Sequence, residues 1–110
     1  MNVAVSQEGG ISVVSVEGSI DGKTAPLVKQ EINPALEATK SLILDLSKVD
    51  YLSSAGLRLL LLIYREFAAK QGKLVLLGVS EDIQTVMSHT GFLNFFTLAG
   101  TKAEAIRALA

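Results

Sequence analysis

The chain has 110 residues, of which 49% are apolar and 19% charged, so we expect one well-filled domain over residues 1–110 and no intrinsic disorder. Ten basic and 11 acidic side chains, with no long run of one sign, argue against nucleic acid or an anionic membrane as a partner. The absence of cysteine excludes disulfides and thiolate metal sites and fits a reducing compartment.

The sequence also indicates a cytoplasmic protein with no direct membrane insertion. Its first residues, Met1 to Val5, lack the basic start and apolar core of a signal peptide. Its longest apolar stretch, Leu59 to Tyr64, is about a third of the roughly 20 residues that a membrane-spanning helix needs.

The first elements in chain order are two short β-branched runs, residues 3–7 and 11–17. Gly9 and Gly10 between them favour the positive φ angles of a tight turn, so an antiparallel hairpin is predicted. A helix should follow from Thr24, as its cap, to about Ala38. Its apolar residues at helical spacing are Leu27, Val28, Ile32, Ala35 and Leu36. Pro34 removes a backbone donor, which allows a kink or an early end near Asn33.

The middle of the chain centres on Leu42–Leu46, which is apolar on both faces and predicts a central parallel strand. We expect a loop over residues 47–52, with Ser53 or Ser54 as the cap of a helix from about residue 55 to 71. The remaining predictions are a strand at 74–78, a helix at 81–88 capped by Ser80, a strand at 95–98, and a final helix capped by Thr101 with Ala105, Ile106 and Leu109 on one side.

The resulting order, ββαβαβαβα, predicts an α/β fold. Such alternation favours a mixed, mostly parallel sheet with right-handed crossover helices and the antiparallel hairpin at one side. Function in these folds gathers beyond the carboxyl ends of the parallel strands. That rule indicates the segment after Leu46.

Two adjacent serines, Ser53 and Ser54, stand where this segment enters a helix. Free backbone N–H groups and the positive helix end would tolerate a phosphate on the serine itself. The added charge of about −1.5 to −2 would repel a partner docked over Ser54 while leaving the fold intact. The simpler alternative is that both serines only cap the helix.

The helix after the serines adds a second signal. Its apolar face, at 3.6 residues per turn, consists of Leu57, Leu60, Leu61, Tyr64, Phe67 and Ala68. Leu59 and Leu62 fall on the opposite arc among charges that include Arg58, so we expect them to be exposed as a docking surface. In the alternative reading, the first turns are buried on both sides by the C-terminal helix.

The segment Tyr51-Leu52-Ser53-Ser54-Ala55-Gly56-Leu57 resembles the signature loop of STAS domains, the anti-sigma-factor antagonists of bacteria. In that loop an aromatic-apolar pair precedes Asp-Ser-Ser/Thr-Gly-Leu. Gly18-Ser19-Ile20-Asp21 resembles the family's exit from the second strand, and Val86 through Thr90-Gly91-Phe92 with Phe96 resembles the segment before its last strand. The resemblance spans essentially the whole chain and implies a single STAS-like domain.

The resemblance implies a role for each residue of the turn. Ser54 falls on the phosphorylated serine, with Ser53 as second choice, Gly56 on the glycine that opens the helix, and Asp21 on an acid near the serine. Ser53 replaces the family's aspartate and Ala55 its second hydroxyl residue, which leaves Asp21 and Asp50 as candidates for the lost charge. The expected partner-binding set is Asp21, Ser53, Ser54, Ala55, Gly56, Arg58, Leu59 and Leu62.

The mechanism that the resemblance implies is a binding switch. The unphosphorylated antagonist binds an anti-sigma factor that is also an ATP-dependent serine kinase, and thereby frees a sigma factor. Phosphorylation breaks that complex, and a metal-dependent serine phosphatase resets it. The chain itself would need no cofactor and no metal. The alternative is a constitutive adaptor subunit of a stress-sensing or lipid-transport complex.

Catalysis by the chain itself is not expected. A serine nucleophile needs a base within hydrogen-bond reach, and the one histidine, His89, lies about 35 residues beyond Ser54. Gly-x-Ser-x-Gly, phosphate-loop and paired-histidine motifs are absent from the sequence. A phosphocarrier that uses His89 is a narrower variant.

Overall fold

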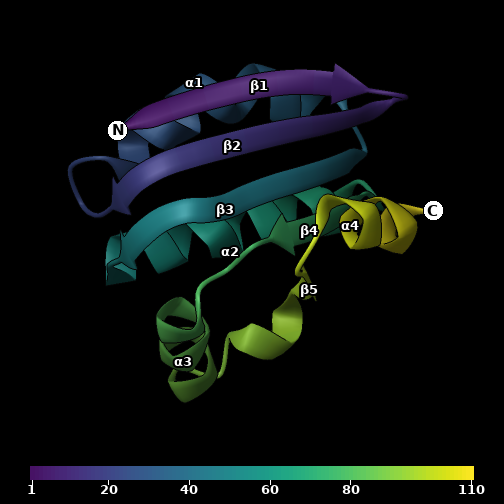
Figure 1. Ribbon diagram of the computed structural model, residues 1–110. Coiled ribbons are helices and arrows are strands. Elements are labelled where there is room, and N and C mark those ends of the chain that lie inside the picture. Colours follow the sequence, from purple (N-terminus) through teal and green to yellow (C-terminus); the bar gives the residue numbers. More distant parts are fainter.

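The computed structural model describes all 110 residues and contains one five-stranded sheet with helices on both faces (Figure 1). The strands lie in the order β1-β2-β3-β4-β5. Their bounds are β1 Asn2–Glu8, β2 Ile11–Ile20, β3 Ser41–Leu52, β4 Lys73–Leu77 and β5 Thr97–Ala99. β1 and β2 are antiparallel and the other neighbours are parallel. The predicted mixed sheet, with a hairpin at one side and a central third strand, is confirmed.

The helices are α1 Ala25–Ala38, α2 Ser54–Ala69, α3 Glu81–His89 and α4 Lys102–Leu109, with a short 3-10 turn, η1, at Leu93–Phe95. The predicted order ββαβαβαβα is therefore confirmed. Side chains of α1, α2 and α3 share the larger hydrophobic core with one face of the sheet. α4 covers the other face through a separate cluster that includes Ala105 and Leu109. Ile106, predicted to share that side, is exposed.

The N-terminal hairpin turns on Gly9 and Gly10, whose φ angles are +56° and +83°. Positive φ at both central residues defines the two-residue type I′ turn, whose twist matches that of the flanking strands. Glu8 and Ile11 close the turn as a directly opposed pair.

Helix α1 keeps its full predicted length although Pro34 lies inside it. Ala35 and Leu36 beyond the proline are buried, and their packing retains the last turn. Thr24 stands at the N-cap position but makes no cap hydrogen bond with its side chain. Of the five apolar residues at helical spacing, Leu27 is 52% exposed, whereas Val28 is buried. The 100° step between these neighbours turns Leu27 away from the core.

Strand β3 is much longer than predicted, because residues 47–52 extend it instead of forming a loop. The end of β2 runs beside this extension and pairs with it, from Glu17 opposite Lys48 to Ile20 opposite Leu52. Two register shifts interrupt the pairing and break the apolar alternation by which a strand is recognised in sequence. The segment Ser53-Ser54-Ala55-Gly56, which we call the serine turn, consequently follows a strand and not a loop.

The last predicted strand, at 95–98, is also displaced. The structure places Phe95 in η1 and begins β5 at Thr97. The predicted strand at 74–78 and helix at 81–88 lie within one residue of β4 and α3, and Ser80 caps α3 as expected.

Candidate functional site

The serine turn lies against the end of β2. Ile20 and Leu52 are register partners at the carboxyl ends of two parallel strands. One residue further on, the Ser53 N–H donates a hydrogen bond to the Ile20 carbonyl at 2.9 Å. The segment that contains Asp21 is thereby brought beside the serines, although 32 positions separate Asp21 from Ser53 in the sequence. Folds of this kind collect their functional loops at this side of the sheet, where the parallel strands have their carboxyl ends.

The two serines have different roles at the start of α2. Ser53 is the N-cap residue, and its Oγ accepts a hydrogen bond from the Gly56 N–H at 3.3 Å. Ser54 is the first residue of the helix, and its side chain is exposed. The alternative in which the serines act only as caps therefore fits Ser53 and does not account for Ser54.

Gly56 lets the helix start approach the end of β2 closely. A Cβ on this residue would lie 2.6 Å from the Ile20 carbonyl oxygen and 2.6 Å from Leu52 Cδ1. Its φ angle is not in the positive region, so the reason for glycine here is space and not backbone conformation. Any larger residue would push α2 off the strand that orients it.

Asp21 organises the turn between β2 and α1. Its Oδ1 accepts hydrogen bonds from the backbone N–H groups of Lys23 (2.9 Å) and Thr24 (3.0 Å). These two bonds, that from Thr24 first, favour the charged form and lower the pKa of the Asp21 carboxyl below its usual value. Asp21 thus carries its negative charge beside the serine turn while its carboxylate is bound within its own turn.

Asp50 is the second candidate to supply the negative charge that Ser53 lacks in place of aspartate. It lies near the same carboxyl end of the sheet. Its Oδ1 accepts a hydrogen bond of 3.0 Å from the Ser19 hydroxyl across the β2–β3 pair. Both predicted acids are therefore in the neighbourhood of the serines.

One of the two leucines predicted to be exposed is buried. Leu59 is only 6% exposed, so that prediction is wrong, whereas Leu62 is 44% exposed, as predicted. Leu59 lies on the flank of α2 that faces α1, where Lys29 Nζ and Glu66 Oε1 join the two helices at 2.8 Å. The alternative prediction, in which the C-terminal helix buries the first turns of α2, is also wrong, because that helix packs on the other face of the sheet.

The core face of α2 is rotated relative to the prediction. Ile63 is buried, Tyr64 is half-buried and Ala68 is exposed. The exposed side carries Ser54, Arg58, Leu62 and Arg65, at spacings of four, four and three residues. Such spacing aligns side chains on one face of a helix, and we call these four residues the serine stripe. Two arginines thus flank one exposed leucine in line with Ser54.

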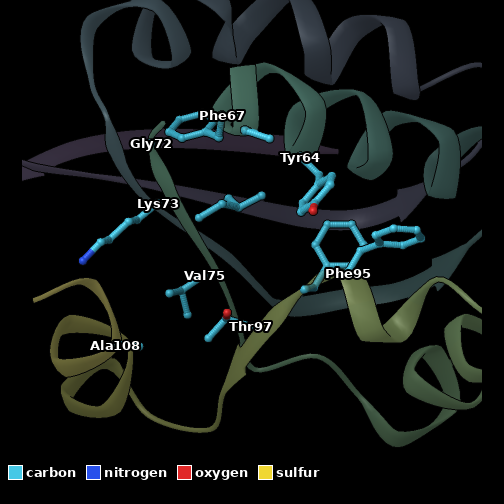
Figure 2. A pocket seen from close by; sticks show the side chains of 11 residues that line it. Tyr64, Phe67, Gly72, Lys73, Val75, Phe95, Thr97 and Ala108 are labelled. Atoms are coloured by element: carbon cyan, nitrogen blue, oxygen red, sulfur yellow. The ribbon is translucent and has the colours of Figure 1, made fainter. Parts of the chain in front are cut away.

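A pocket, shown in Figure 2, is lined by residues other than those of the serine turn. It measures about 400 Å³ and is lined by the second half of α2 together with β4, β5, η1 and α4. The Tyr64 ring meets those of Phe95 and Phe96 there, with centroids 5.5 and 5.7 Å apart. Thirteen residues of helix, or about 20 Å, separate Ser54 from Phe67 in its lining. The apolar spacing of α2 predicts Tyr64 in the core and gives no sign of this aromatic cluster.

Three further observations concern possible metal ligands, the single histidine and the hydropathy of the helices. No group of three or more His, Asp and Glu side chains is placed to hold a metal ion. His89 is exposed in the last turn of α3, the position expected for it. None of the helices combines the length and hydropathy needed to cross a bilayer.

The STAS domain family matches residues 2–105 of the chain. The chain belongs to the STAS domain family. A crystal structure of an anti-sigma factor antagonist from Mycobacterium paratuberculosis is 31% identical, with a TM-score of 0.87 over 98% of this chain and 92% of that one. BtrV of Bordetella bronchiseptica is 28% identical over 98% of this chain and 94% of its own length. The phosphorylated form of the Bacillus cell fate determinant SpoIIAA shares the fold, with 22% identity and a TM-score of 0.74 over 99% of this chain and 100% of that one.

The first testable prediction concerns the cap. Ser53→Ala removes the acceptor for the Gly56 N–H and should lower the free energy of unfolding by about 1 kcal/mol in urea titrations. Ser53→Asp keeps an acceptor and adds a negative charge at the helix start, so its stability should equal or exceed that of the wild type. Ser54→Ala is the control, with an expected change within about 0.5 kcal/mol. An equal loss in Ser54→Ala would contradict the assignment of the cap.

A second prediction concerns the close approach at Gly56. Gly56→Ala should lower the free energy of unfolding by about 1–3 kcal/mol, because the new methyl group meets backbone that cannot move aside. Gly22→Ala is the matched control, since a Cβ there meets nothing within 4 Å. Its stability should stay the same or rise slightly. Similar losses in the two variants would show that Gly56 is not required for spacing.

Proposed function

We propose that the chain is an anti-sigma-factor antagonist whose unphosphorylated form binds an anti-sigma factor with serine kinase activity and so releases a sigma factor. Phosphorylation of Ser54 switches this binding off, and a serine phosphatase restores it. The observation that carries the proposal is that the two serines have different roles: Ser53 caps α2, whereas Ser54 is exposed. The chain is the substrate and ligand in this cycle, and its partners perform the chemistry.

The position of Ser54 suits a reversible phosphate. Its hydroxyl is exposed at the first position of a 16-residue helix, where N–H groups and the helix dipole favour an anion. Arg58 lies four residues further on, the spacing at which side chains on one helix face meet. A phosphate on Ser54 would therefore have a cation in reach, and the fold would not need to change.

The same geometry explains why a phosphate would end binding. In the unphosphorylated chain, Arg58 and Arg65 offer positive charge on either side of Leu62, which suits a partner surface with an apolar pocket and acidic groups. A phosphate of about −1.5 to −2 charge would neutralise Arg58 and repel those acidic groups. Both effects oppose the complex and neither disturbs the core.

Ser53 in place of the family's aspartate changes charge more than structure. Serine and aspartate are both strong N-caps, so either side chain can accept the Gly56 N–H. What the chain lacks is a carboxylate next to Ser54, and Asp21 and Asp50 supply negative charge on the same edge. Ser53 is the less favourable phosphorylation site, because its own hydroxyl oxygen is engaged in the cap.

The switch is tested with the anti-sigma factor encoded in the same genome. Ser54→Asp should raise the Kd of the complex at least about tenfold, or about 1.4 kcal/mol, with unchanged thermal stability. Ser54→Ala should bind like the wild type and take up no phosphate when the kinase partner and ATP are added. Mass spectrometry of the wild-type protein from its native cell should locate an acid-stable phosphate on Ser54.

The constitutive adaptor is the outcome that would overturn the switch. It predicts equal binding by Ser54→Asp and wild type, together with no phosphate on Ser54 under any growth condition.

The docking role of Leu62 can be separated from a structural one by comparing two leucines on the same helix. Leu62→Ala should weaken partner binding about tenfold and change stability by less than about 0.5 kcal/mol, because the side chain is exposed. Leu59→Ala should lower stability by about 2–5 kcal/mol, because it leaves a cavity between α1 and α2. A large loss of stability in Leu62→Ala would rule out the docking role.

A further inference from the structure

The two edges of the sheet differ in how they are protected. β5, at one edge, is only three residues long. β1, at the other, has seven residues and pairs with β2 without a register shift. Proteins usually protect an edge strand by short length, bulges, proline or lysine. Residues 2–8 contain no proline, lysine or arginine, and no strand pairs with β1 on its outer side.

The turn geometry identifies the backbone groups at this free edge. In a two-residue type I′ hairpin, the residues that flank the turn, Glu8 and Ile11, form a hydrogen-bonded pair, and such pairs alternate along the ladder. The even-numbered residues of β1 therefore bond to β2. Val3, Val5 and Gln7 direct their N–H and C=O groups outward.

The side chains on this strand suit a copy of itself. Val3 and Val5 lie on the same face of β1, because side chains alternate along a strand. Val3 packs against the main core, whereas Val5 remains 46% exposed. In an antiparallel pair of two β1 strands, Val3 of each copy can stand opposite Val5 of the other, with Ala4 on the two-fold axis. This register pairs the outward backbone groups and stacks four valines on one face.

We propose that the chain forms a two-fold symmetric dimer through β1, in which two five-stranded sheets join into one of ten strands. Charge favours a second copy as the occupant of this edge. Glu8 is the one charged residue of β1, and it is paired with Lys102 at 2.7 Å. In the register described, the two Glu8 residues lie about 26 Å apart along the strands, too far to repel each other appreciably.

The flank of α1 above β1 supports the same interface. Lys29 reaches α2 through Glu66, so the opposite flank of α1 lies on the β1 side. Leu27 is two residues before Lys29, about 200° away around the helix, and it is 52% exposed. Figure 1 shows α1 running behind β1. Edge-to-edge pairing would bring two α1 helices together and cover Leu27 as well as Val5.

The dimer is distinct from the proposed switch. The serine stripe is on α2, which lies over the centre of the sheet beyond α1 (Figure 1). The serine stripe of each copy therefore stays accessible in the dimer. The dimer does not depend on the proposed function.

The test is sedimentation equilibrium of the full chain between about 5 and 500 µM, a range chosen because one paired strand and a helix flank make a small interface. The apparent mass should rise from that of the 11.7 kDa monomer toward twice that value. Val5→Lys places two cations beside the axis and should raise the dimer Kd at least tenfold. Val86→Lys is the matched control, since Val86 is an equally exposed valine (43%, against 46% for Val5) on α3, and it should dimerise like the wild type.

A second variant removes one backbone donor. Val5→Pro deletes an N–H that faces away from β2, so the monomer should remain folded by circular dichroism while the dimer is lost. Amide hydrogen exchange should show concentration-dependent protection at Val3, Val5 and Gln7.

Three results would overturn the proposal. One is a monomer at every concentration. Another is a dimer that tolerates both Val5 variants. The third is protection of these amides only after an anti-sigma factor is added, which would assign the edge to that partner.

Discussion

The hydrogen bond from the Ser53 N–H to the Ile20 carbonyl fixes the point at which α2 leaves the sheet, and the site depends on it. Because this bond joins the ends of β2 and β3, it also brings the Asp21 turn beside the serines. The missing Cβ of Gly56 allows the contact to be close. Once the start of the helix is fixed, its 100° step determines the rest: Leu57 and Leu60 enter the core, and Ser54 and Arg58 face solvent.

The features that sequence predicted correctly depend on local signals. Gly9 and Gly10 specify their turn through backbone conformation alone, and Ser80 and Thr101 cap helices through bonds to residues three positions away. The features that it missed depend on distant segments. Residues 47–52 become strand only because β2 runs beside them. Leu59 is buried because α1 covers a second flank of α2, and no periodicity within α2 contains that information.

The candidate site divides in the same way. The pattern of residues located the serine turn but could not distinguish a cap from a modification site, because both readings require a hydroxyl at a helix start. One contact, from the Gly56 N–H to Ser53 Oγ, assigns the cap to Ser53, and the modification of Ser54 stays a proposal. The serine stripe was predicted in part. The position of Leu62 among charged residues correctly indicated that it is exposed, but Leu59 was wrongly grouped with it. A second covering helix can be recognised only from the assembled layers.

A switch of the proposed kind requires that the modified residue contribute little to stability, and Ser54 meets that requirement. Folding depends on Ser53, whose oxygen satisfies an otherwise free N–H, and on Gly56, whose size permits the contact with Ile20. Ser54 lies between these two residues in the sequence but takes no part in either interaction. A phosphate there would change charge and shape at the surface and leave the cap and core as they are. The proximity of the cap and the proposed switch residue has a physical reason: the start of α2, fixed by the cap, holds the Ser54 hydroxyl in one place, so that a partner would meet the same surface each time.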